Sequence, residues 1–481
     1  MSQASYPKPD ATANAPTDAK YVAGYARLWE RRRVGALLHP TSLPGPDDCG
    51  VLGADARRCI DLLVAAGFTV WQTLPLGPVD NSLSPYQLKS VHAGNPRLID
   101  RQAVPRWTEV RTDFKAFWRS EQHWLLPYAL FVACRRANGN QPWWHWPPAL
   151  RDREPAAVSA ALATHAEMIR ETVIDQYLFD RQWQAVKQYA NSRGLLILGD
   201  LPFYVDQDSV EVWWHRTLFQ IDQEGRPTVV AGVPPDYFSA DGQLWGNPIY
   251  AWDRMAADGF RWWVERVAHQ MRRFDALRLD HFRAFESHWE IPAAATSARS
   301  GCWKPTPGVA LLETLQRELG ELPFLAEDLG LITPPVHELR QQFDLPGMLV
   351  LQFAFDGSAD NPYLPANHAT HAAVYTGTHD NDTTVGWYSA LDDSARAAIA
   401  QALGNQASPM PDALIEAALA SPAQLAVLPM QDLLGLDSRS RMNVPGTPAG
   451  NWTWRFKWED VPPDFATRFR ELAARYRRLV A

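Results

Sequence analysis

The chain has 481 residues, with 46 Lys and Arg against 54 Asp and Glu and a formal net charge of −8. This balance, without a basic stripe, excludes a typical nucleic-acid-binding protein, because such proteins neutralise phosphates with clustered cations. No apolar run approaches the roughly 20 residues that span a bilayer. Residues 1–20 are polar and rich in Pro and Ala, without the apolar core of a signal peptide. We expect a cytoplasmic protein in which residues 1–20 form a disordered tail.

The cysteine and tryptophan contents narrow the class further. The four cysteines are scattered without CxxC spacing, which is typical of reduced thiols rather than of a disulfide framework or a zinc site. The 21 tryptophans are many for this length, and large core residues account for most of them. Indole rings also stack on the apolar faces of sugars, so the excess favours a carbohydrate-binding groove.

Alternating strand-like and helix-like segments define the predicted fold. Amphipathic stretches predict helices at 55–66, 171–191, 260–271 and 310–319, and several of these end at a glycine directly before the next apolar run. This alternation predicts an α/β fold with a parallel sheet, and eight strands are the number that closes a (β/α)8 TIM barrel. The predicted strands, in chain order, lie near 34–39, 67–72, 195–199, 274–279, 323–327, 348–353, 372–376 and 425–430.

Two long segments interrupt the predicted barrel. More than a hundred residues separate the second and third strands, and we predict a helical subdomain at about 95–170 within this gap. A stretch rich in Pro, Gly and aromatic residues, 202–253, follows the third strand and is expected to form an active-site loop region. Barrels tolerate such insertions in the loops of the catalytic face. Residues 21–481 are therefore expected to form a single catalytic domain.

Four acidic residues stand at the ends of predicted strands. The runs LLILGD, DALRLD, PFLAED and AVYTGTHD place Asp200, Asp280, Glu327 and Asp380 at the carboxyl ends of their strands. Parallel barrels build their active sites at that end, so these side chains should converge. A single Asp in such a place is often only a helix cap or an ion-pair partner. Several in one chain predict the carboxylates that glycoside chemistry needs, one as acid/base and one as nucleophile when the configuration is retained.

The order of motifs resembles a known group of enzymes. GDLPFYV, RLDHFR, AEDLG and THD resemble the four signature regions of the α-amylase clan. SPYQ near the second strand and the loop motif DGQLWGNPIYAW narrow the resemblance to the 4-α-glucanotransferases of glycoside hydrolase family 77, called amylomaltases or disproportionating enzymes. The resemblance covers about residues 37–454.

The resemblance implies roles for individual residues. Asp280 would be the nucleophile, Glu327 the general acid/base, and Asp380 the carboxylate that holds the hydroxyls of the distorted sugar. Arg278 shares a strand face with Asp280, and its charge would keep that carboxylate ionised. The remaining positions implied in substrate binding are Tyr86, Asp200, Asp236, Gln243, Trp245 and His379, for two of which (Gln243 and Trp245) packing on the barrel rim is the alternative.

Two departures from the family pattern are visible. Ala284 follows RLDHFR where the family has Gly, and the run GPVDNSL before SPYQ differs from the usual wording. Neither departure touches an implied catalytic group. The pairs His281 with Glu286 and Asp380 with Asp382 resemble metal ligands only weakly, so no metal and no cofactor are expected.

The sequence therefore predicts a retaining 4-α-glucanotransferase, EC 2.4.1.25, that moves α-1,4-glucan segments between maltooligosaccharides. Maltooligosaccharides and linear α-1,4-glucans are the expected partners, with no nucleic acid and no membrane. Two alternatives stay open at this point. The chain could be an α-glucan hydrolase with the same residues, or a non-catalytic glucan-binding barrel. Transfer requires the site to hold a sugar hydroxyl at high effective concentration and to exclude water.

Overall fold

The computed structural model describes residues 28–45, 48–235, 241–404, 408–447 and 449–479. Its centre is a parallel eight-stranded sheet with strands in the order β10-β11-β12-β1-β2-β3-β6-β9. The two ends of this order also meet, because the amide of Ala326 donates to the carbonyl of Pro346, 2.9 Å away, directly before β10. The predicted (β/α)8 barrel is confirmed. Its strands are β1 (Arg33–Leu37), β2 (Val70–Gln72), β3 (Leu196–Leu201), β6 (Ala276–Leu279), β9 (Phe324–Ala326), β10 (Gly347–Val350), β11 (Ala372–Tyr375) and β12 (Leu425–Pro429).

Alternation along the strands divides the core into two layers. Val70, Leu198 and Val427 belong to one buried cluster, which fills the barrel interior. Their chain neighbours, such as Trp71 and Ile197, belong to a second and larger cluster that packs against the surrounding helices. Successive side chains on a strand point to opposite faces. Every second strand residue therefore faces the interior, which also holds the positions from which a site at the barrel mouth is built.

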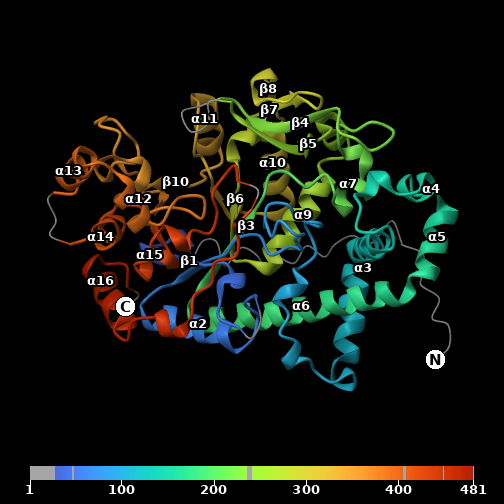
Figure 1. The fold of residues 1–481 in the computed structure, drawn as a ribbon, viewed down its shortest axis with the longest axis horizontal. Helices are drawn as coiled ribbons and strands as arrows, with labels where there is room; N and C mark the ends of the chain where they lie inside the picture. Colours follow the sequence, from blue (N-terminus) through green and yellow to red (C-terminus); the bar gives the residue numbers. More distant parts are fainter. Residues whose placement is uncertain (1–27, 46–47, 236–240, 405–407, 448, 480–481) are drawn as a thin grey trace.

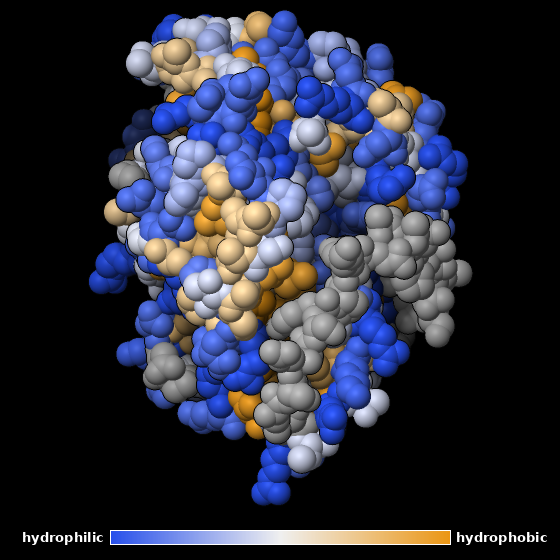
Figure 2. Space-filling view, turned by 90° about the vertical axis from the view of Figure 1, so that its right-hand side faces the viewer, coloured by the Kyte–Doolittle hydropathy of each residue, from blue (hydrophilic) through white to orange (hydrophobic). Residues whose placement is uncertain are grey.

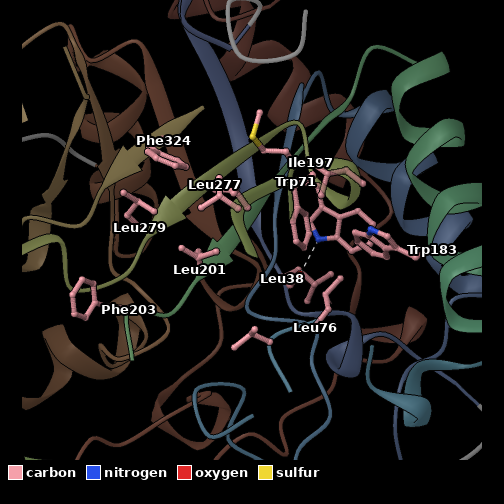
Figure 3. Close-up of a cluster of buried hydrophobic side chains, with 14 of the residues drawn as sticks. Leu38, Trp71, Leu76, Trp183, Ile197, Leu201, Phe203, Leu277, Leu279 and Phe324 are labelled. Atoms are coloured by element: carbon pink, nitrogen blue, oxygen red, sulfur yellow. Dashed lines mark hydrogen bonds between the residues drawn. The ribbon is translucent and has the colours of Figure 1, made fainter. Parts of the chain in front are cut away.

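The outer layer is held by large apolar side chains from the helices. Trp183 of α6 lies 6.4 Å from Trp71, ring centre to ring centre, and both are fully buried (Figure 3). The indole of Trp71 donates to the carbonyl of Leu38, 2.8 Å away. The helices that surround the barrel are α2 (Ala54–Ala65), α6 (Ala166–Ser192), α9 (Arg261–Arg273), α10 (Gly308–Leu319), α11 (Pro334–Gln342), α12 (Thr384–Ala390), α13 (Asp393–Ala402), α14 (Asp412–Ala420), α15 (Met430–Leu433) and α16 (Phe465–Arg475).

A helical extension lies on one side of the barrel, between β2 and β3 (Figure 1). It contains α3 (Trp107–Ala137), α4 (Pro148–Arg151) and α5 (Pro155–Thr164), and α3 packs along α6. The outer face on this side is mainly hydrophilic, with a smaller apolar area near its middle (Figure 2). None of the described helices is both long and apolar enough to cross a membrane.

A second, antiparallel sheet stands at the upper edge of the molecule in Figure 1, and the sequence did not predict it. Its order is β5-β4-β7-β8, and a β-bulge interrupts the pairing of β4 with β5. These strands are short and lie among turn residues, so they read as loop. They are β4 (Val229–Val233), β5 (Gln243–Pro248), β7 (Ser287–Pro292) and β8 (Cys302–Pro305), accompanied by the short helices α7 (Val210–Trp214) and α8 (Trp252–Ala257).

Candidate active site

Asp200 and Arg278 face each other across two neighbouring strands. They are direct partners in the register of β3 with β6, and both point into the barrel interior. Nη1 of Arg278 lies 2.7 and 2.9 Å from the two carboxylate oxygens of Asp200. The same atom lies 3.0 Å from Oδ1 of Asp280, two residues further along β6. One buried guanidinium thus joins two carboxylates from adjacent strands.

Asp280 and Glu327 stand one step beyond the last residues of their strands. The strand pairing continues to both, since Asp280 donates its amide to Leu201 and Glu327 donates its amide to Leu279. His281 adopts a left-handed backbone conformation with φ 51°. In this conformation its amide donates to Oε2 of Glu327 at 2.7 Å. The backbone directly after Asp280 therefore holds the carboxyl group of Glu327 beside it.

Burial and neighbouring charges shift the pKa values of Asp280 and Glu327. Burial raises the pKa of Asp280 above its usual value, although the charges of Arg278 and His379 oppose this change. Burial also raises the pKa of Glu327, well above its usual value; Arg278 opposes this change and the Asp280 charge adds to it. Asp280 has the direct contact with Arg278. The contact with Arg278 favours the ionised form of Asp280, and burial favours the protonated form of Glu327; retaining glycoside chemistry uses such a pair.

Tyr86 links the loop after β2 to this charge network. Its hydroxyl donates to Oδ2 of Asp200 at 2.8 Å. Its ring stacks on His379, with ring centres 5.2 Å apart and planes inclined by 12°. Trp452 lies against both rings, 5.9 Å from each. An aromatic wall therefore stands beside the carboxylates, as the site of a sugar ring requires.

Asp380 is more open than Asp200 and Asp280, with 47% of its side chain exposed. Its Oδ2 lies 3.3 Å from Nε2 of His379. The side-chain amide of Asn443 donates to its Oδ1 at 2.6 Å, and Arg441 donates to its backbone carbonyl. Burial lowers the pKa of His379, so this ring is neutral at pH 7, with one nitrogen as a hydrogen-bond donor and the other as an acceptor. Asp380 lies close enough to Asp280 to act on its charge.

The antiparallel sheet brings Gln243 and Trp245 to the rim of the site. The indole of Trp245 donates to Oε1 of Gln243 at 3.0 Å. Its ring meets that of His281 edge to face, with ring centres 4.9 Å apart. The predicted site residues in the described ranges are thus gathered around one barrel mouth. Asp236, also predicted, lies outside the described residues.

Two residues that the sequence did not indicate also belong to the site. Asn443 and Trp452 come from the segment after β12 and contact Asp380 and Tyr86. No strand-end pattern marks this segment, and the only signal was the pair of tryptophans in NWTW. Its contribution depends on how it crosses the barrel mouth.

Two carboxylates from the pairs that weakly resemble metal ligands, Asp382 and Glu286, accept hydrogen bonds from serine hydroxyls. Asp382 accepts from Ser438 at 2.8 Å, and Glu286 accepts from Ser287 at 2.6 Å. Across the described ranges, no group of three or more His, Cys, Asp or Glu side chains is arranged to hold a metal ion.

Paired carboxylates, a shared arginine and an aromatic wall at the mouth of a (β/α)8 barrel define an enzyme that acts on glycosidic bonds.

Comparison with known proteins identifies the family. A profile of the 4-α-glucanotransferase family, glycoside hydrolase family 77, matches residues 38–111 and 105–460, and the chain belongs to this family. It is 45% identical to the 4-α-glucanotransferase of Thermus thermophilus over 93% of this chain and 99% of that protein. It is 42% identical to the enzyme of Synechocystis over 89% and 94% of the two chains.

A solved structure agrees with this assignment. The amylomaltase from Streptococcus agalactiae, in complex with acarbose, is 34% identical and superposes with a TM-score of 0.89, covering 94% of this chain and 100% of that one. The predicted family, fold and 4-α-glucanotransferase activity are therefore confirmed, and the substrate is an α-glucan. Of the three functions that the sequence left open, the family assignment supports the glucan transferase rather than the α-glucan hydrolase or the non-catalytic glucan-binding barrel.

Proposed function

We propose that Asp280 is the nucleophile and Glu327 the general acid/base of glucan transfer. The observation that carries this proposal is the different support of two adjacent carboxyl groups. Asp280 lies 3.0 Å from the Arg278 guanidinium, which favours its ionised form. Glu327 accepts one backbone amide and has a raised pKa, which favours the protonated acid that a leaving oxygen needs.

The first half of the reaction follows from these roles. The Asp280 carboxylate attacks the anomeric carbon while Glu327 gives its proton to the departing glycosidic oxygen. A covalent glycosyl-enzyme and a shortened glucan result. In the second half, Glu327 takes the proton from a 4-hydroxyl of an incoming glucan, which attacks the anomeric carbon and releases Asp280. Each cycle breaks one glycosidic bond and forms one.

The surrounding residues have supporting roles in this proposal. Asp380 and His379 hold hydroxyl groups of the distorted sugar, and the charge of Asp380 stabilises the transition state. Tyr86 stacks on the sugar at the cleavage point, and Asp200 holds Arg278 and the Tyr86 hydroxyl in place. Gln243 and Trp245 line the donor and acceptor subsites, to which Asp236 would also contribute. The preferred substrates are maltooligosaccharides and linear α-1,4-glucans, and the acarbose complex of a relative supports a site for oligosaccharides.

The expected cellular and domain organisation are also proposals. We place the enzyme in the cytoplasm. We treat residues 21–481 as one catalytic domain, with a helical subdomain at about 95–170 and an active-site loop region at 202–253. The helices α3, α4 and α5 support the first insertion.

The test uses pure maltotriose and the variants Asp280→Asn and Glu327→Gln. Wild-type enzyme should give glucose and a ladder of longer oligomers at a constant number of reducing ends. Each variant should lower kcat by about 1,000-fold or more. With α-maltotriosyl fluoride, whose leaving group needs no proton, Glu327→Gln should still form a glycosyl-enzyme and Asp280→Asn should not.

Asp275→Asn is the matched control. Asp275 lies at the opposite end of β6, where it accepts from Asn191 and from the Ile197 amide. This variant should keep the wild-type kcat. Wild-type conversion by Asp280→Asn or Glu327→Gln would refute the assigned roles.

A further inference from the structure

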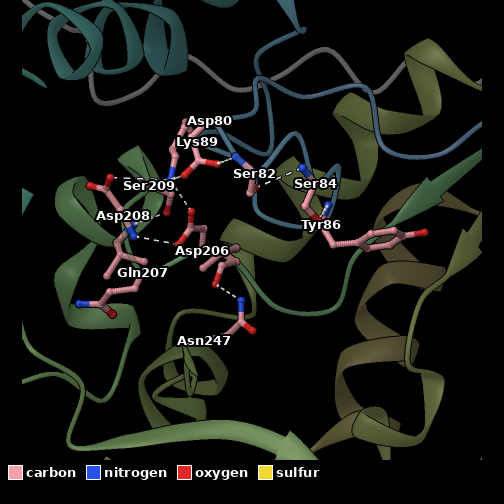
Figure 4. Close-up of polar contacts among 12 residues, drawn as sticks. Asp80, Ser82, Ser84, Tyr86, Lys89, Asp206, Gln207, Asp208, Ser209 and Asn247 are labelled. Carbon is pink, nitrogen blue, oxygen red and sulfur yellow. Dashed lines mark hydrogen bonds and ion pairs between the residues drawn. The ribbon is translucent and has the colours of Figure 1, made fainter. Parts of the chain in front are cut away.

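Lys89 is a buried lysine three residues beyond Tyr86. Only 10% of its side chain is exposed, and its ammonium group lies among three carboxylates (Figure 4). Nζ is 3.1 Å from Asp80, 2.6 Å from Asp206 and 3.7 Å from Asp208. Asp80 belongs to the loop after β2 that carries Tyr86, whereas the other two belong to the loop after β3. We call these four residues the Lys89 cluster.

The charges of the Lys89 cluster are matched by their surroundings. A buried ammonium is stable only when paired, and removing one partner of a buried pair is strongly destabilising. Burial lowers the pKa of Lys89, but Asp206 and its neighbours outweigh this and raise it. Asp208 also accepts from Arg135 of α3 at 3.0 Å. The backbone joins the loops as well, because the amide of Val210 donates to the carbonyl of Lys89.

A chain of short hydrogen bonds runs from Asp80 to Tyr86, in steps of two residues. The amide of Ser82 donates to Oδ1 of Asp80 at 2.9 Å. The amide of Ser84 donates to Oγ of Ser82 at 3.2 Å, and the amide of Tyr86 donates to Oγ of Ser84 at 3.3 Å (Figure 4). A displacement of Asp80 would therefore be transmitted through these local hydrogen bonds to the backbone of Tyr86.

We infer that the Lys89 cluster is a positioning device that fixes the Tyr86 loop against the loop after β3, and so sets the sugar-stacking ring at the cleavage point. This rests on the proposed role of Tyr86. Lys89 anchors Asp80 to Asp206, and Asp80 begins the hydrogen-bond chain that ends at Tyr86. Asp80 lies in GPVDNSL, the run that departs from the family wording.

The contacts of the Lys89 cluster are separate from those of the proposed catalytic carboxylates. The hydrogen-bond chain that begins at Asp80 meets the charge network at Tyr86, whose hydroxyl donates to Asp200. Loss of the anchor should therefore displace the aromatic ring while leaving Arg278, Asp280 and Glu327 in their contacts. Small displacements at a reacting sugar have large effects on rate.

A double-mutant cycle tests this inference, with kcat and KM for maltotriose as readouts. Asp80→Ala should lower kcat/KM by about 10-fold in the presence of Tyr86. In the Tyr86→Ala background the same substitution should change kcat/KM by less than about 2-fold, because the group through which it acts is gone. Lys89→Met should behave like Asp80→Ala, and Lys89→Arg should restore most of kcat/KM.

Lys187→Met is the matched control. Lys187 is a lysine of similar burial on α6, 3.6 Å from Asp275 at the far end of the barrel. It should lower the thermal midpoint without changing kcat/KM. Thermal midpoints of all variants show which remain folded, and Asp80, with 30% of its side chain exposed, is the more tolerant position.

Three results would overturn the inference. They are an unchanged kcat/KM in folded Asp80→Ala, an equal loss in both Tyr86 backgrounds, or an equal loss in Lys187→Met. A wild-type kcat/KM in the Tyr86→Ala single variant is a different outcome. It would refute the proposed role of Tyr86 itself, and the inference with it.

Discussion

Arg278 holds the charge balance of the site at the scale of single residues. It is the cation in contact with both Asp200 and Asp280, and its side chain is 5% exposed. The two carboxylates raise the pKa of Arg278 well above its usual value, against the effect of burial. Asp280, the proposed nucleophile, and Asp200 therefore share one counter-ion.

Arg278→Met should leave the carboxylates of Asp200, which is buried, and Asp280 without this cation. We expect kcat to fall by about 100-fold or more and the free energy of unfolding to fall by about 3–5 kcal/mol. Maltotriose kinetics and denaturant unfolding measure the two effects. Arg278→Lys should lie between wild type and Arg278→Met, since lysine keeps the positive charge but carries it on a flexible stem without the rigid, planar donor group of arginine. Wild-type kcat in Arg278→Met would contradict the shared counter-ion.

The titration of Glu327 should make the folded protein less stable as the pH rises. Its pKa is raised in the folded state, chiefly by burial, so the folded chain releases this proton less readily than the unfolded chain. Below the usual pKa of Glu both states are protonated and stability is unaffected. Above it, stability is lost progressively as the pH rises toward the raised pKa. Glu327→Gln does not titrate, so its thermal midpoint should exceed that of wild type by more at pH 8 than at pH 5. A constant difference would contradict this assignment.

At the scale of elements, α6 is attached to the barrel through Trp183. The indole is fully buried between β2 and α9, donates to the carbonyl of Arg273, and lies 5.6 Å from Phe274. Trp183→Ala should lower the free energy of unfolding by about 3–5 kcal/mol through loss of contacts and the cavity that remains. Trp183→Phe should lose less. Both should keep kcat while folded, because the helix lies outside the barrel; a fall in kcat would contradict this.

The pairing of β5 with β4 places Trp245 at the rim of the site, where it is proposed to line the donor and acceptor subsites. Trp245→Ala should raise the KM for maltotriose about 3- to 10-fold, as expected for one lost stacking contact. It should also raise the share of hydrolysis, since a less enclosed site admits water. Hydrolysis creates reducing ends and transfer does not, so a reducing-end assay separates the two. Trp245→Phe should keep most of both properties. An unchanged reducing-end count in Trp245→Ala would assign this ring to packing alone.

The elements that could be predicted from the sequence are those with a local signal. All eight barrel strands are buried on both faces and read as apolar runs, and the helices before them end at glycines such as Gly67 and Gly194. The four strand-end acids followed from the same runs. The antiparallel sheet was missed because β7 and β8 are short and mix polar, aromatic and proline residues without an apolar run, and because β7 also pairs with β4, far earlier in the chain. Asn443 and Trp452 were missed because their position depends on the folded chain after β12.

At the scale of the whole molecule, the last described segment secures the barrel at its first strand. Arg478 is 1% exposed and donates to backbone carbonyls of Arg33, Leu419 and Ser421 at 2.7–2.8 Å. Arg478→Ala would remove this donor from all three carbonyls, although those of Leu419 and Ser421 would keep Arg32 as a second donor. We expect a loss of about 3 kcal/mol or more in the free energy of unfolding, measured by denaturant titration, with little change in kcat of the folded enzyme. Arg475→Ala, an exposed neighbour, is the control and should change stability little.

The pairing of β1 with β12 has a consequence for synthesis of the chain. These two strands are separated by nearly the full length of the sequence, yet they are hydrogen-bonded neighbours from Arg33–Leu425 to Leu37–Pro429. A ribosome must therefore finish almost the entire polypeptide before its first strand has a partner on that side. Until then both strands beside the gap expose unpaired backbone groups, which invite association with other chains. Glucan transfer begins only once the ring of strands is complete.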